Sequence, residues 1–168
     1  LAMRGEDLLS NTPRQILIQE ALGFPRLQYL HLPLILAPDR TKLSKRRHAT
    51  SVGDFRTRGY TASGLVNFLA LLGWNPGTTQ EIFSMDELVT TFDLTKIQPS
   101  AAIFDDVKLN WFNREHMLRM DQAAFWEHAE EFLTEQTVTM LDSKNIWADV
   151  VPVMRERAST FGDVKLAD

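Results

Sequence analysis

Positive charge is concentrated in one short stretch of this sequence. Residues 38–48 read Pro-Asp-Arg-Thr-Lys-Leu-Ser-Lys-Arg-Arg-His, with five cations from Arg40 to Arg47 and no carboxylate between Arg40 and Asp54. The whole chain carries 18 basic against 22 acidic side chains, and its formal net charge is −4. Because salt screens exposed charges beyond roughly 10 Å, a local cluster of cations acts mainly on what lies beside it. The loop is therefore a candidate site for a polyanion.

The elements on either side of the loop would hold it in place. Residues 29–36 carry Leu at alternate positions, which predicts a strand, and Pro33 marks an edge or the point where ladder bonding stops. After the loop, Ser51 and Asp54 form a short capping box that opens a helix, which Gly59 closes. A strand, a cationic loop and a helix together outline a phosphate-binding arrangement, in which Lys supplies a compact charge and Arg a planar fork.

A short run rich in Lys and Arg has a second interpretation. Such runs are common as solvated loops or localisation patches. On the loop alone this second interpretation is favoured, because Lys-x-Ser-Lys is a weak pattern by itself. The rest of the chain has to decide between the two.

Length and composition restrict the possible classes of protein. With 168 residues and 44% hydrophobic side chains, the chain can bury the core of one domain or of two small ones. No apolar run approaches the ~20 residues of a membrane span, and there is no signal peptide. There are no cysteines and the four histidines are widely spaced, so we expect neither disulfides nor a metal site. These features fit the cytoplasm. Leu1 in place of an initiator Met predicts a piece of a longer protein.

The first 36 residues have the pattern of a β-α-β crossover. Residues 1–3 read as the end of a strand that runs into a polar group, Arg4 to Asp7. Asn11-Thr12-Pro13 predicts a helix start, with the helix over 13–22 and the second strand at 29–36. Polar residues at the carboxyl end of a strand in such a fold face the ligand crevice. Arg4 could fork onto a carboxylate there.

Beyond residue 50 we expect helices and no strands. Helix caps are predicted at Thr61, Ser84, Asp105 and Asp121. The last segment, 143–168, reads as helical with an interruption at Pro152. The composition shift near residues 50–60 is the main boundary, and a softer one lies near residue 120. The fold class is therefore mixed and mostly α.

Two sets of residues could be mistaken for functional ones. Aromatic side chains can stack on bases, but at helical spacing among leucines they are predicted to be core. Glutamates along one helix are predicted to be a solvated face. The aromatic residues are Trp74, Trp111, Phe112 and Trp126, and the glutamates are Glu127, Glu130, Glu131 and Glu135.

Several blocks of sequence, taken in order, resemble bacterial-type glutamyl-tRNA synthetase. No single block is decisive, but the joint order is highly specific, and the likeness runs from residue 1 to about 119. The blocks are Arg4-Gly5-Glu6-Asp7 with Leu9-Ser10-Asn11-Thr12-Pro13, His31-Leu32-Pro33-Leu34-Ile35-Leu36, Lys42-Leu43-Ser44-Lys45-Arg46, Asn67-Phe68-Leu69-Ala70-Leu71-Leu72-Gly73-Trp74, and Phe104-Asp105 followed by Lys108-Leu109, Trp111 and Asn113.

The resemblance implies a class I synthetase that makes glutamyl-adenylate from glutamate and ATP, with Mg²⁺, and then esterifies tRNA. Lys42 to Arg46 would be the family's variant of the Lys-Met-Ser-Lys-Ser signature loop. The resemblance also implies that Lys45 is the catalytic contact to the departing pyrophosphate. Lys42, Ser44 and Arg46 would assist it in binding ATP. Backbone groups at Leu34 and Ile35 would hold the adenine. Arg4 would bind the substrate glutamate.

The resemblance also implies a division of the chain into three parts. Residues 1–56 would be the carboxyl-terminal piece of a doubly wound, Rossmann-type catalytic domain. Residues 57–120 would be a helical stem-contact domain, and 121–168 the start of a helical anticodon-binding domain. Because the chain carries a net negative charge and tRNA is a polyanion, contacts to tRNA are expected from local cations. We expect a monomer without membrane contact. The candidate tRNA contacts are Arg56, Arg58, Arg114 and Arg119.

The sequence also leaves alternatives to a complete glutamate ligase. The His-x-Gly-His-type motif that holds ATP in class I enzymes is absent from these residues, so the chain alone is expected to be inactive. Leu8 stands where the family is expected to have a His, and Leu1 also departs from the pattern, which leaves room for a paralogue that charges the tRNA for glutamine with glutamate. A non-catalytic helical module that binds RNA or protein is the alternative. A truncated paralogue that glutamylates a modified tRNA base is disfavoured by the helices after Met120.

Overall fold

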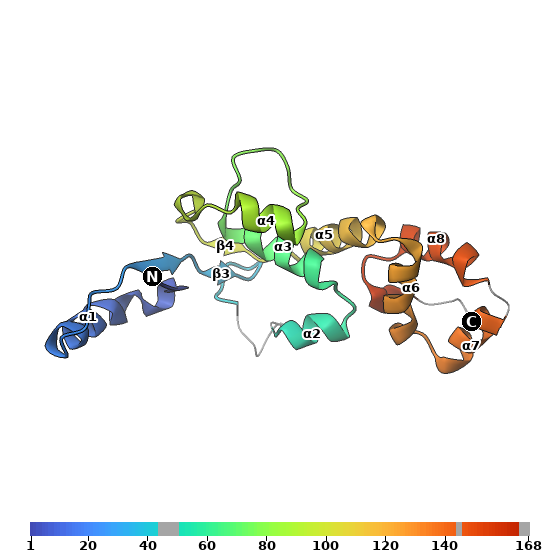
Figure 1. Ribbon diagram of the computed structural model, residues 1–168, viewed down its shortest axis with the longest axis horizontal. Helices are drawn as coiled ribbons and strands as arrows, with labels where there is room; N and C mark the ends of the chain where they lie inside the picture. Colours follow the sequence, from blue (N-terminus) through green and yellow to red (C-terminus); the bar gives the residue numbers. More distant parts are fainter. Residues whose placement is uncertain (44–50, 144–145, 165–168) are drawn as a thin grey trace.

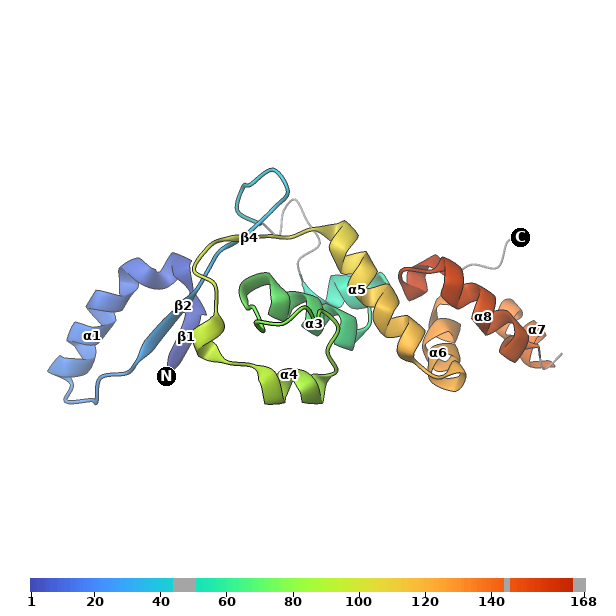
Figure 2. The same ribbon diagram turned by 90° about the horizontal axis from the view of Figure 1, so that it is seen from above.

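The computed structural model describes residues 1–43, 51–143 and 146–164. The molecule is elongated, and both views place α1 at one end and α7 at the other (Figures 1 and 2). Among the described residues, two small two-stranded parallel sheets accompany helices that make up most of the regular structure, which confirms a mixed, mostly helical fold. In the described residues no helix is both long and apolar enough to span a membrane.

The predicted β-α-β crossover forms at the amino-terminal end. Its elements are β1 (Ala2–Gly5), the 3-10 helix η1 (Glu6–Asn11), α1 (Thr12–Ala21) and β2 (Tyr29–Leu32). The strands pair in parallel, with Ala2 opposite Tyr29 and Arg4 opposite His31. Pro13 lies in the first turn of α1, where its missing N–H costs no helical hydrogen bond. This crossover brings the polar group after β1 to the carboxyl edge of the sheet.

The predicted strand over 29–36 is divided at Pro33. β2 ends at Leu32, and β3 (Ile35–Leu36) pairs in parallel with β4 (Ala102–Ile103). The amides of Ala102 and Phe104 donate to the carbonyls of Leu34 and Leu36 at 3.1 and 2.8 Å. The prediction that no strand follows residue 50 is therefore wrong. β4 is too short to show a two-residue period, and it exists only because a strand far away in sequence accepts its hydrogen bonds.

Four α-helices form the middle of the molecule, and their caps agree with the sequence. They are α2 (Val52–Thr57), α3 (Ala62–Gly73), α4 (Met85–Thr91) and α5 (Asp106–Arg119), with the 3-10 helix η2 (Leu94–Lys96) between α4 and α5. The side chains of Ser51, Thr61, Ser84 and Asp105 each accept from a backbone amide of the helix that follows. One cluster of buried side chains lies between α3 and α5. At Gly64 a Cβ would sit only 2.9 Å from the Cα of Asn113, so a side chain there would push the two helices apart.

A second helical group closes the carboxyl-terminal end. It comprises α6 (Gln122–Ala129), the 3-10 helix η3 (Glu130–Phe132), α7 (Glu135–Ser143), α8 (Trp147–Arg157) and the 3-10 helix η4 (Phe161–Asp163). Pro152 lies inside α8, so the predicted interruption there is wrong. Its missing N–H removes one helical hydrogen bond. Val151 and Met154 are buried in the core shared with α6, and this burial offsets the loss.

The aromatic residues divide in a way that periodicity explains. Trp74, Phe112 and Trp126 are buried, as predicted, whereas Trp111 is 41% exposed. The buried positions of α5 are 109, 112, 113, 116 and 117, which is a single helical stripe. Residue 111 lies off that stripe, so the prediction that Trp111 is core is wrong.

The chain returns from α8 to the start of α3, and we call these contacts the joint. The amide of Phe161 donates to the carbonyl of Gly59 at 2.9 Å, and the side-chain amide of Asn113 donates to the carbonyl of Ser159 at 2.6 Å. Gly59 has φ 83°, and a Cβ there would lie 2.2 Å from the amide nitrogen of Gly162. The joint therefore requires glycine at this position and fixes the second helical group against the first.

Candidate functional site

Arg4 is held in a fixed orientation by four neighbours. Its guanidinium donates to Gln15 Oε1 and Thr12 Oγ1 at 2.5 Å each and to His31 Nε2 at 3.3 Å, and it lies 4.9 Å from the centre of the Tyr29 ring. None of these partners is a carboxylate. They orient the fork without neutralising its charge, so Arg4 can still attract an anion. We call these five residues the Arg4 cluster.

The Arg4 cluster also determines the tautomer of its histidine. His31 Nε2 accepts from Arg4 and lies 3.0 Å from Thr12 Oγ1, which leaves the ring proton on Nδ1. Beside the cluster lies a cavity of about 320 Å³, lined in part by Arg4, Gln15 and Tyr29. Arg4 was predicted as a site residue from the sequence, but the four residues that orient it were not. The signal that would have found His31 is strand register, since it lies opposite Arg4.

The described part of the cationic loop begins beside the polar group after β1. Lys42 Nζ contacts Asp7 Oδ2 at 3.1 Å, and the two side chains are 62% and 48% exposed. The predicted turn is present, because Asp39 Oδ1 accepts from the amide of Thr41 at 2.9 Å. Ser44, Lys45 and Arg46 lie outside the described residues. The contact to Asp7, three residues after Arg4, places the start of the loop on the Arg4 side of the sheet.

The backbone at Leu34 and Ile35 joins this loop to the second sheet, β3–β4. The carbonyl of Leu34 accepts from Ala102, and that of Ile35 accepts from Leu43 at 3.2 Å. Leu36 forms an isolated bridge with Lys42. These carbonyls each carry a protein partner, so recognition of adenine at this position stays a prediction. The arrangement anchors the loop at its first two signature residues.

The four arginines proposed as polyanion contacts have different surroundings. Arg114 donates to the carbonyl of Glu156 at 2.8 Å, and Arg119 pairs with Glu115 at 3.0 Å. Arg58 stacks on the rings of Phe55 and Tyr60. Arg56, by contrast, forms no side-chain hydrogen bond or ion pair with any described residue. The structure therefore leaves Arg56 the most available of the four.

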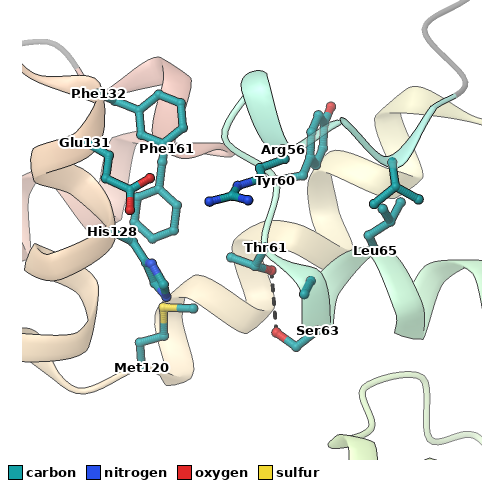
Figure 3. Close-up of a pocket in the computed structure, with 12 residues that line it drawn as sticks. Arg56, Tyr60, Thr61, Ser63, Leu65, Met120, His128, Glu131, Phe132 and Phe161 are labelled. Carbon is teal, nitrogen blue, oxygen red and sulfur yellow. Dashed lines mark hydrogen bonds between the residues drawn. The ribbon is translucent and has the colours of Figure 1, made fainter. Parts of the chain in front are cut away.

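Arg56 lines a cavity of about 570 Å³ between the two helical groups (Figure 3). One wall comes from α2 and the start of α3, with Tyr60, Thr61 and Ser63. The opposite wall comes from α6 and η3, with His128 and Glu131. In the described part of the chain no three side chains of His, Cys, Asp or Glu are grouped to hold a metal ion.

Comparisons with known proteins agree with the motifs. Residues 2–111 match the sequence model of the family described as tRNA synthetases class I (E and Q), catalytic domain. A glutamate--tRNA ligase from Carboxydothermus hydrogenoformans is 59% identical over 111 residues, covering 66% of this chain and 23% of that protein. One from Desulforudis audaxviator is 40% identical over 167 residues, covering 97% of this chain and 33% of that protein.

The fold agrees as well. The crystal structure of glutamate-tRNA synthetase from Elizabethkingia anophelis superimposes with a TM-score of 0.78 at 29% identity, covering 96% of this chain and 36% of that one. The chain thus spans about a third, or less, of the length of these relatives. The resemblance found in the sequence is confirmed. The match over residues 2–111 to the catalytic-domain model shows that the chain belongs to the class I tRNA synthetases for E and Q.

Proposed function

We propose that the chain supplies part of an ATP-dependent ligase that attaches glutamate to tRNA through a glutamyl-adenylate, in the cytoplasm. The observation that carries this proposal is the contact between Lys42 and Asp7. It brings the first residue of the signature loop to the same edge as Arg4. In this proposal Lys42 and the rest of the loop meet the triphosphate, and Arg4 meets the amino-acid carboxylate.

The chemistry required of the loop follows from the charge that moves during the reaction. A carboxylate oxygen of glutamate attacks the α-phosphorus of ATP, the new O–P bond forms, and the bond to the pyrophosphate oxygen breaks. Negative charge grows on the leaving pyrophosphate, and a cation placed there stabilises the transition state more than bound ATP. We assign this role to Lys45, with Lys42, Ser44 and Arg46 shaping the loop and binding ATP.

Mg²⁺ and the amino acid have separate places in this proposal. Mg²⁺ neutralises phosphate charge, and it is commonly held by substrate phosphates and water rather than by a protein cage. Arg4, oriented by neutral partners, binds a carboxylate of glutamate with its fork. The backbone at Leu34 and Ile35 receives the adenine.

The helical parts orient the tRNA. Residues 1–56 belong to the doubly wound catalytic domain, 57–120 to the stem-contact domain and 121–168 to the anticodon-binding domain, all in one monomer. Arg56 and Arg58 are exposed, and neither forms an ion pair with a carboxylate among the described residues. Arg114 and Arg119 are already engaged with Glu156 and Glu115, so we expect them to contribute less.

A chimera tests the catalytic role. Residues 1–168 replace the matching segment of the Desulforudis audaxviator ligase, and exchange of labelled pyrophosphate into ATP is measured with glutamate. Lys45→Ala should reduce the exchange rate by about 10²–10³ while glutamate binding survives. The matched control is Lys108→Ala, because Lys108 is half exposed and pairs with Glu81 away from the loop.

The alternative is a helical RNA- or protein-binding module whose loop only touches phosphates. In that case the chimera is inactive, and Lys45→Ala weakens polyanion binding slightly and equally for all sequences. An active chimera that tolerates Lys45→Ala would remove Lys45 from the mechanism. The 168-residue chain by itself should give no exchange, because it contains no ATP-holding His motif.

A further inference from the structure

The cavity between the two helical groups is held open by the fold itself. The joint lies beside it, since Phe161 both lines the cavity and donates its amide to Gly59. Arg114 bonds to the carbonyl of Glu156, and Arg155 donates to the carbonyl of Met120 at 2.7 Å. These contacts fix α8 against the end of α5. Together with the joint, they connect the two helical groups on either side of the cavity.

Two opposite charges extend into this space without meeting. Figure 3 shows the guanidinium of Arg56 and the carboxylate of Glu131 reaching in from opposite walls. They do not form an ion pair, and in the described part of the chain neither side chain has another hydrogen-bonding partner. The hydroxyl of Ser63 lies on the same wall as Arg56 and is only weakly engaged, at 3.5 Å from Thr61 Oγ1. The cavity therefore offers a cation, an acceptor and a donor.

This combination matches the chemistry of a ribonucleotide. A guanidinium fork matches phosphate oxygens, and a carboxylate accepts a hydrogen bond from a ribose hydroxyl. A volume of about 570 Å³ falls within the range of roughly 300–1,000 Å³ that small-molecule sites occupy. The aromatic rings of Phe132 and Phe161 form an apolar part of the lining. A simple anion site would not place a carboxylate opposite its cation.

We propose that this cavity holds one ribonucleotide of the RNA substrate, with Arg56 on its phosphate and Glu131 on its 2′-hydroxyl. The proposal rests on the proposed function, because it takes tRNA as the partner. It adds a position at which the protein distinguishes RNA from DNA, since the 2′-hydroxyl is the group that differs. It also assigns a role to Glu131, which the sequence analysis placed on a solvated face.

The test is a binding measurement on the 168-residue chain. The probes are a glutamate-accepting tRNA transcript and the DNA of the same sequence, each at two salt concentrations. Arg56→Ala should weaken binding of both probes about tenfold and reduce the salt slope by about one. Glu131→Ala should weaken RNA binding about five- to tenfold and leave DNA binding unchanged. Arg157→Ala and Glu127→Ala are the matched controls, because both residues are exposed on helices outside the cavity.

Glu131→Gln separates a hydrogen bond from simple repulsion. The glutamine carbonyl still accepts from a 2′-hydroxyl, so the preference for RNA over DNA should persist. If Glu131→Ala and Glu131→Gln instead strengthen binding of both probes equally, Glu131 only repels phosphate and the proposal is overturned. If the wild-type chain binds tRNA with a clear salt dependence while the Arg56 and Glu131 variants match it, the cavity is not the site but the proposed function stands. A wild-type chain that binds tRNA no better than unrelated RNA would overturn both.

Discussion

The amino-terminal region and the helical region of this molecule have very different cores. In the helical region, residues 51–143 and 146–164, three clusters of buried side chains hold the helices together. In the amino-terminal region, residues 1–43, Ala37 is the buried hydrophobic residue, and α1 exposes much of its apolar surface. Leu17 is 65% exposed and Ile18 is 59% exposed.

Arg4 and Lys42, which are proposed to contact glutamate and ATP, belong to the region that has few buried side chains. Arg4 is placed by the two-stranded β1–β2 sheet and α1, and Lys42 by a bridge to Leu36 in the β3–β4 sheet, whereas parallel sheets in folded proteins are normally covered on both faces. The helical region supplies a rigid scaffold and the cavity. Within these 168 residues, buried packing is concentrated in the helical region, whereas Arg4 and Lys42 lie in a region that buries little apolar surface of its own. A change in one region should therefore not resemble the same change in the other.

The largest expected contrast comes from the same truncation made in each region. Leu109→Ala removes a side chain of zero exposure from the α3–α5 core, so we expect the free energy of unfolding to fall by about 2–5 kcal/mol. Leu17→Ala removes an exposed side chain, and the change should stay within about 0.5 kcal/mol. Urea denaturation followed by circular dichroism measures both. Equal losses would show that the two regions share one core.

A second contrast concerns buried and exposed asparagines. Asn113 has zero exposure, accepts from the amide and hydroxyl of Thr61 at 2.8 Å, and donates to Ser159. Asn113→Ala leaves these groups without partners, so unfolding should become easier by about 2–3 kcal/mol. Asn11 is exposed at the start of α1 and makes no capping bond, so Asn11→Ala is the control, with an effect within about 0.5 kcal/mol.

A third and smaller effect should appear as a pH dependence of the helical region. Burial lowers the pKa of His116 below its ordinary value of 6.5, with Arg119 adding to this and Glu115 opposing it. The unfolded chain therefore takes up a proton at this residue that the folded chain does not. The stabilisation is complete above about pH 6.5 and declines as the pH falls toward the folded-state pKa.

The measurement is the free energy of unfolding between pH 7.5 and 5. His116→Gln should flatten the part of this profile below about pH 6.5, since Gln can still donate to Asn67 but does not titrate. His128→Gln is the control, because His128 is exposed on α6. If both variants keep the slope of the wild type, His116 does not carry the effect.

Local signals in the sequence predicted the local structure well. A cap requires only residues three or four positions apart, and Ser51 with Asp54, Thr61 and Ser84 with Glu87 all form as expected. Features that depend on distant partners escaped prediction. β4 needs β3, and the helix through Pro152 needs the packing of Val151 and Met154 against α6. In both cases the element is stabilised by contacts with residues that are distant in the sequence.

The candidate site follows the same rule. Arg4 and Lys42 could be named because their types and neighbours form recognisable motifs. Their partners Thr12, His31 and Asp7 could not, because strand register and loop path decide those contacts. The cavity beside Arg56 was also beyond prediction, since its opposite walls come from helices that only the joint brings together.

The hydrogen bond from Phe161 to Gly59 also determines when the two helical groups can be joined during synthesis. Its two ends are separated by about a hundred residues, so closure is among the long-range steps that slow folding. On a translating ribosome, α2 and α3 emerge long before the segment that seals them. A nascent chain stopped before residue 159 would leave the amide of Asn113 and the carbonyl of Gly59 facing water.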